Sequence, residues 1–220
     1  MKVSFQFVRN SALSQDSSSG DTEPIINSVE SSSIESAINL MNIYIGKELN
    51  LSHCKVIVFS EEYAKSGVSS TINTLVNNTQ IRPSTNVIIS KCSADYYIAN
   101  SSSTLESLVT RYYDIFPNSS NYTGYTANVT IGEFFNKMIG STSQSTAILG
   151  GINTTKNTNI SKNDAETISN KSSISGERGN ESIGLAVFNG DRLIGELNAL
   201  ETLCHLINTN DISSFRSRTR

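Results

Sequence analysis

The sequence contains few of the side chains that enzymes commonly use for catalysis or metal binding. Its 220 residues include only three cysteines and two histidines. Cys54, Cys92 and Cys204 lie far apart, and their neighbours match neither a CxxC metal pattern nor the dense spacing of a disulfide-rich scaffold. The histidines, His53 and His205, are also far apart. We therefore expect no metal site and no cofactor, and we interpret the cysteines as small buried apolar residues.

Charge is scarce as well. Charged residues make up 17% of the chain, the net charge is -3 and the pI is near 5.4. No basic cluster is interleaved with aromatic residues, which argues against nucleic acid as a partner. No apolar run reaches the roughly 18 residues needed to span a membrane, and residues 1–8 lack the charged-then-apolar order of a signal segment. We expect this chain to be soluble, either cytosolic or with its export segment removed.

Phosphate-binding loops and paired catalytic acids are missing too. The glycines at Gly150 and Gly176 do not fit the G-x-G-x-x-G or G-x-x-x-x-G-K-[ST] patterns. Glu61 and Glu62 follow a β-prone run directly, so we interpret them as first-turn helix residues rather than as a carboxylate pair.

Two neighbouring cysteine–histidine pairs are the remaining candidates for nucleophilic chemistry. We predict that His53 and Cys54 lie at the start of a strand, where adjacent side chains point to opposite faces. Cys204 and His205 lie on a predicted helix, where adjacent residues do not face each other. A thiolate needs a base within hydrogen-bond reach, so we assign no catalytic residue and predict that the chain is not an enzyme.

The first half of the chain alternates strand and helix signals. Period-two alternation predicts a strand over 2–8, and short β-prone runs predict strands over 54–60 and 86–90. Ser32 and Glu35 form an S-x-x-E capping box before a helix with an apolar stripe. This order predicts a sheet covered by helices. The helices are predicted near 34–45, 61–66, 69–77, 93–100 and 104–116.

The second half begins after a turn-rich stretch. Because Pro117 opens this stretch and a Thr130–Glu133 capping box follows it, we predict a domain boundary between them. The fold class is therefore mixed α/β, with two small domains at 1–120 and 121–220, each a central mixed sheet flanked by helices.

Three features are predicted within the second domain. A strand is expected near 146–152, and a long polar loop at 153–182 is expected to be partly disordered or to hold a short edge strand. The NGD turn between two apolar runs predicts a hairpin. Asn198 and Glu201 cap a last helix. Its predicted inward face consists of Leu200, Leu203, Cys204 and Ile207.

Two stretches share a pattern with a known family. In the first, LSHCKVIVFSEEYAKSG places His53 before a strand and a helix, and Arg82 lies in the turn before a second strand, NVIISK. The second stretch, IGLAVFNGDRLIGELNALETL, occupies 183–203. In this order they resemble the Ger(x)C lipoproteins, the C subunits of bacterial spore germinant receptors. The resemblance covers most of the chain.

The resemblance implies a non-enzymatic role in nutrient sensing during spore germination. It implies a C subunit held to the outer face of the spore inner membrane by an N-terminal lipid (palmitate), working with integral-membrane A and B subunits. It does not indicate whether this subunit binds the nutrient. The family's signal segment, lipid-accepting cysteine and third C-terminal domain are absent. We therefore expect a fragment with the first two domains of such a subunit, soluble alone and docking through a mostly polar surface.

Two other classes of function stay open at this point. One is a soluble hydrolase or thiol enzyme that uses Cys54 or Cys204, and fast labelling of one cysteine at neutral pH would favour it. The other is a solute-binding module, for which a sheet flanked by helices is a suitable scaffold but does not define a ligand.

Overall fold

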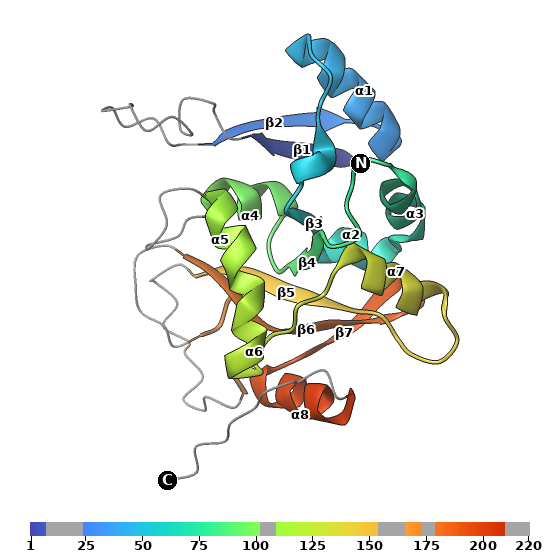
Figure 1. Ribbon diagram of the computed structural model, residues 1–220. Coiled ribbons are helices and arrows are strands. Elements are labelled where there is room, and N and C mark those ends of the chain that lie inside the picture. The colour runs from blue at the N-terminus through green and yellow to red at the C-terminus, as the bar shows by residue number, and fades with distance from the viewer. Residues whose placement is uncertain (8–23, 102–108, 154–165, 173–178, 210–220) are drawn as a thin grey trace.

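The computed structural model describes residues 1–7, 24–101, 109–153, 166–172 and 179–209 (Figure 1). In this part of the chain the strands form an antiparallel pair, β1-β2, and a five-stranded sheet in the order β3-β4-β5-β6-β7. The strands β3, β4 and β5 are parallel, whereas β6 and β7 are antiparallel to their neighbours. The predicted mixed α/β class is confirmed. The strands are β1 Lys2–Phe7, β2 Ile25–Glu30, β3 Val56–Ser60, β4 Asn86–Ser90, β5 Thr146–Asn153, β6 Gly179–Asn189 and β7 Arg192–Leu197.

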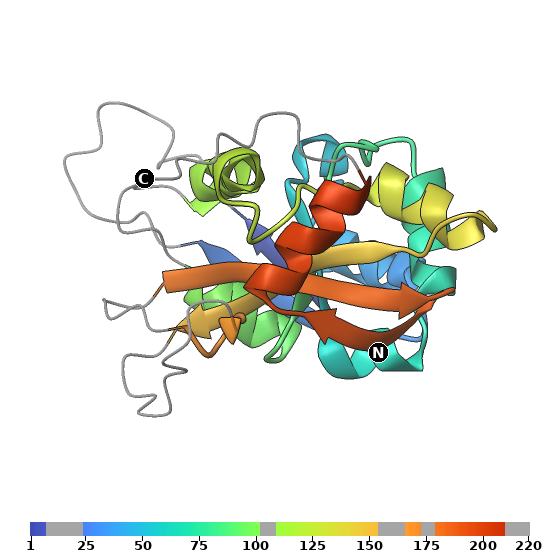
Figure 2. The ribbon, with the colours of Figure 1, turned by 90° about the horizontal axis from the view of Figure 1, so that it is seen from below.

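Helices cover both faces of the five-stranded sheet. Figure 2 shows α2 and α4 on one face and α5 and α7 on the other, while α8 packs against β6 and β7. The α-helices are α1 Ile34–Ile45, α2 Glu61–Ser66, α3 Ser69–Asn77, α4 Ala94–Asn100, α5 Val109–Ile115, α6 Ser120–Thr123, α7 Ile131–Ile139 and α8 Ala199–Thr209. The 3₁₀ helices are η2 Leu51–His53 and η3 Phe116–Ser119.

The predicted domain boundary between Pro117 and Thr130 is wrong. Strand β4, from before this stretch, pairs in parallel with β5, from after it, so one sheet and one hydrophobic core contain both halves. Pro117 is buried, and the backbone N–H of Val87 in β4 donates to the carbonyl of Val129 at 3.0 Å. The turn-rich stretch is therefore a connection between α5 and α7 rather than a boundary between domains.

The β1-β2 hairpin is attached to the larger sheet through α4. Lys2 Nζ lies 2.6 Å from Asp95 Oδ2, and Gln6 Nε2 donates to the Ile98 carbonyl at 2.9 Å. These contacts join the first residues of the chain to a helix that covers the five-stranded sheet (Figure 1).

The structure tests two of the predicted helix starts directly, whereas the start of the helix predicted over 104–116 lies outside the described residues. Thr130 caps α7 and accepts from the Glu133 N–H, as predicted. The N-cap of α1, however, is Ser33, whose hydroxyl accepts from the Ser36 N–H, so the predicted Ser32–Glu35 capping box is wrong. Consecutive serines offer the same hydroxyl at neighbouring positions, and sequence alone does not distinguish them.

The last helix begins as predicted but buries a different face. Asn198 and Glu201 each accept a hydrogen bond from the other's backbone N–H at 2.9 Å. Leu200, Cys204 and Ile207, predicted to face inward, are exposed. A second stripe, one residue earlier in the helix, packs toward the sheet instead. It consists of Ala199, Thr202 and Leu206.

The NGD turn joins β6 to β7, which confirms the predicted hairpin. Most of the predicted 153–182 loop lies outside the described residues. Its last residues, from Gly179 onward, belong to β6 and pair with β5, so they form part of an internal strand of the sheet.

Candidate functional site

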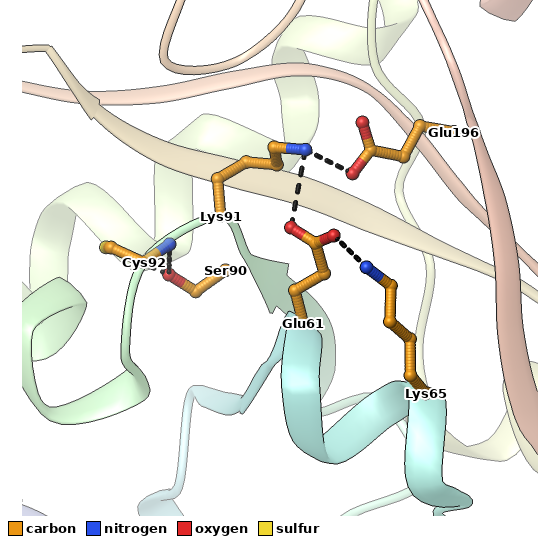
Figure 3. Close-up of polar contacts among 6 residues, drawn as sticks. All are labelled: Glu61, Lys65, Ser90, Lys91, Cys92 and Glu196. Atoms are coloured by element: carbon orange, nitrogen blue, oxygen red, sulfur yellow. Dashed lines mark hydrogen bonds and ion pairs between the residues drawn. The ribbon is translucent and has the colours of Figure 1, made fainter.

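The carboxyl ends of the parallel strands β3 and β4 are joined to β7 by ion pairs. Lys91, directly after β4, places Nζ 2.5 Å from Glu196 Oε1 and 3.4 Å from Glu61 Oε2 (Figure 3). Lys65 binds the other oxygen of Glu61 at 2.5 Å, and this hydrogen bond lowers the pKa of the Glu61 carboxyl. Open α/β sheets usually bind ligands at this edge. Here the charged side chains bind one another, so the arrangement holds α2, β4 and β7 together.

A polar pocket of about 270 Å³ lies at the opposite edge, where β3 and β4 begin. Its lining comes from the turn at 52–55, the turn at 82–86 and the α5–η3 region at 113–118, together with Asn128 and Thr130. Segments far apart in the sequence converge here because the amino ends of parallel neighbouring strands lie side by side.

Hydrogen bonds hold the pocket wall in one arrangement. Thr85 Oγ1 donates to the Cys54 carbonyl at 3.2 Å. This hydrogen bond links the segment before β4 to the segment before β3. Asn86 Nδ2 donates to Asn128 Oδ1 at 2.7 Å and to the Val129 carbonyl at 3.2 Å. These contacts are formed within the protein itself, so the wall is preformed.

An ion pair closes the pocket on the side of α5. Lys55 Nζ lies 2.7 Å from Asp114 Oδ1, and both side chains remain partly exposed. The pair links the residue before β3 to α5, and it neutralises the carboxylate that lines the pocket.

His53 and Cys54 both line this pocket but form no nucleophile–base pair. They lie in and directly after η2, because β3 begins only at Val56, and not on the predicted strand from 54. The Cys54 thiol donates to the Val56 carbonyl at 3.4 Å, and burial raises its pKa to about 11. The thiol is therefore protonated at neutral pH, which is unfavourable for a nucleophile. That the chain has no catalytic residue stays a prediction.

The other two cysteines lie in different environments. Cys92 is half-buried next to the Ser90 hydroxyl, 3.2 Å away, and burial raises the pKa of its thiol. Cys204 is exposed on α8, so the interpretation of all three as buried residues is wrong for this one. Within the described ranges, no group of three or more His, Cys, Asp or Glu side chains could hold a metal ion.

Sequence reasoning missed most of the pocket. Arg82 was singled out only through the family pattern, and Asp114, Asn86 and Asn128 not at all. Isolated Asn and Asp side chains carry no local signal for a binding site. They become one site only because the turn before β4, helix α5 and the segment before α7 meet at one edge of the sheet.

Together, the fold and pocket define a mixed α/β protein with a preformed polar site at the amino edge of its sheet. A family model described as the spore germination protein N-terminal domain matches residues 1–154. The chain therefore belongs to the Ger(x)C family of spore germination proteins, and this membership supports a role in spore germination. No curated protein and no solved structure matches it. The matched residues include His53 and Arg82, whereas the motif at 183–203 lies beyond them.

Proposed function

We propose that this chain is part of a C subunit of a nutrient germinant receptor, acting without catalysis beside integral-membrane A and B subunits at the spore inner membrane. The observation that carries the proposal is the family match over residues 1–154. The second motif, at 183–203, supports it, because this motif forms the end of β6, the hairpin and the start of α8 on the same sheet.

The chemistry of the cysteines supports a non-enzymatic role over a thiol hydrolase. A thiol hydrolase needs a thiolate at neutral pH, and burial disfavours the thiolate of both Cys54 and Cys92. Cys204 is exposed on the outer face of α8, away from the lining of the polar pocket.

Spores provide the direct test of the proposed function. Spores that lack the protein containing this chain should fail to respond to at least one nutrient, yet germinate normally with a non-nutrient trigger. Restoring the gene should restore the nutrient response. An unchanged response to every nutrient, or an equal loss with the non-nutrient trigger, would contradict the receptor role.

Copurification tests the proposed partners. The full-length protein, extracted in mild detergent, should bring down the A and B subunits encoded with it. An unrelated membrane protein of the same spores serves as the negative control. Recovery of the C subunit alone, under conditions in which A and B remain associated with each other, would contradict the assembly.

The proposed lipid anchor accounts for attachment to the membrane. No helix in the described ranges is long and apolar enough to cross a bilayer. A single acyl chain gives only marginal, reversible binding, so partner subunits should contribute to retention. The net charge of -3 provides no polybasic attraction to anionic lipid. We expect the 220-residue chain, tested without a lipid and without partner subunits, not to float with liposomes. Strong, salt-insensitive flotation would refute this anchoring scheme.

A further inference from the structure

The polar pocket contains an arginine without an acidic partner. Lys55 and Asp114 neutralise each other at one side of the pocket. Arg82, on the turn before β4, is exposed and forms no ion pair or side-chain hydrogen bond within the described part of the chain. The pocket as a whole therefore carries one uncompensated positive charge, in a protein whose net charge is -3.

The hydrogen-bond pattern also determines which groups the pocket offers to a ligand. The Val129 carbonyl can only accept, so the Asn86 side chain must direct its Nδ2 toward it. The same Nδ2 donates to Asn128, which must therefore present its Oδ1. This leaves the Asn128 Nδ2 group without an acceptor among the described residues.

Further unused polar groups lie beside Arg82 and Asn128. The His53 imidazole and the Ser84 hydroxyl line the pocket, and neither forms a hydrogen bond with the described protein groups. The pocket thus combines a free guanidinium, a free amide N–H₂ group and two further polar side chains. Such a set favours an anionic ligand over a cationic or apolar one.

We propose that this pocket binds the carboxylate group of a small organic acid through Arg82 and Asn128. Guanidinium and carboxylate are planar and pair through two parallel hydrogen bonds, which a lysine cannot reproduce. A monocarboxylate matches the single uncompensated charge, whereas a phosphate dianion would leave one charge without a partner in the site. The volume of about 270 Å³ limits the ligand to a small molecule. This inference does not depend on the receptor assembly proposed above.

The direct test is a titration of the ¹⁵N-labelled 220-residue chain, followed by NMR at constant ionic strength. The probes are sodium acetate, sodium propionate, sodium phosphate and sodium chloride. We expect saturable shifts for the carboxylates, centred on residues 52–55 and 82–86, and weaker or no shifts for chloride and phosphate. Equal shifts with chloride, or shifts spread over the whole surface, would overturn the proposal.

Two variants test the named residues. Asn128→Asp keeps the oxygen that accepts from Asn86, so the wall should stay intact, but it replaces the free donor with a negative charge. It should abolish acetate shifts, and Arg82→Gln should weaken binding about tenfold or more. Matched controls are Asn39→Asp on α1 and Arg192→Gln on β7, both exposed and outside the pocket. Unchanged acetate binding in Asn128→Asp and Arg82→Gln, with the wild-type fold retained, would overturn the assignment.

A second source of carboxylate is an acidic side chain of a partner protein. A short peptide with one central glutamate, blocked at both ends, distinguishes the two sources. Binding of acetate and propionate at least as tight as that of the peptide supports the small-molecule occupant. Saturable shifts with the peptide and none with acetate or propionate would overturn it.

Discussion

Gly150 in β5 lies against the ring of Tyr97 in α4. A β-carbon at residue 150 would come within 2.9 Å of Tyr97 Cε2 and within 2.7 Å of Ile88 Cγ2. Tyr97 and Ile88 are both fully buried, so neither can move into solvent to make room. The absence of a side chain at residue 150 is what allows α4 to pack this closely on the sheet.

Gly150→Ala should therefore destabilise the protein. Overpacking of a closely packed core costs about 1–3 kcal/mol in the free energy of unfolding. Gly195→Ala in β7 is the matched control, since its β-carbon would meet nothing within 4 Å, and a change within about 0.5 kcal/mol is expected. Urea denaturation followed by circular dichroism measures both. Equal stability of the two variants would mean that α4 packs less closely on β5 than described.

Glu181 in β6 holds the described segment 166–172 against the sheet. Glu181 is 5% exposed, and its carboxylate accepts from the Asn170 N–H at 2.9 Å, from Asn153 Nδ2 at 2.5 Å and from the Ser172 hydroxyl. Glu181→Gln replaces one accepting oxygen with a donor that faces other donors. The expected loss is about 1–3 kcal/mol of stability, with faster amide exchange at Ser169 and Asn170.

The control for this substitution is Glu133→Gln. Within the described ranges, the Glu133 carboxylate pairs with Lys137 one helical turn away on the surface, a contact worth about 0.5 kcal/mol or less. Hydrogen exchange measured by NMR should show unchanged protection at Ser169 in this control. Unchanged protection in Glu181→Gln as well would contradict the anchoring role of the carboxylate.

Alkylation should distinguish Cys54 from Cys204. Burial raises the pKa of the Cys54 thiol to about 11, and the thiolate is the reactive species, whereas Cys204 is exposed. Iodoacetamide at about pH 7.5 should modify Cys204 first and Cys54 at least about tenfold more slowly. Peptide mass spectrometry measures both rates in one sample. Faster modification of Cys54 would favour the thiol-enzyme alternative.

The contact between the hairpin and α4 should weaken in acid. The hydrogen bond from Lys2 lowers the pKa of Asp95 from 3.8 to about 2. A depressed carboxyl pKa contributes stability above pH 3.8, and this contribution is lost as the pH falls through about 2. An NMR titration of the Asp95 side chain should give this low pKa. Lys2→Gln should raise it toward its ordinary value, whereas Lys47→Gln, at an exposed site after α1, should not.

Local sequence signals determined most of the elements. Strand β4 and helix α3 occupy the predicted residues, because apolar spacing, turn residues and caps act within a few positions. The NGD turn predicted the β6–β7 hairpin for the same reason. The family resemblance through His53 and Arg82 also came from the sequence, and the match over residues 1–154 confirms it.

Tertiary structure alone decided how these elements combine. The pairing of β4 with β5 crosses the predicted domain boundary, and no local pattern reports which strands become neighbours. On α8, two competing stripes have helical spacing, and packing against β6 and β7 selects the one that contains Leu206. The pocket likewise depends on Arg82 and Asn128 meeting at one sheet edge. Long-range contacts depend on how the whole core packs. They can therefore be identified only from the folded structure.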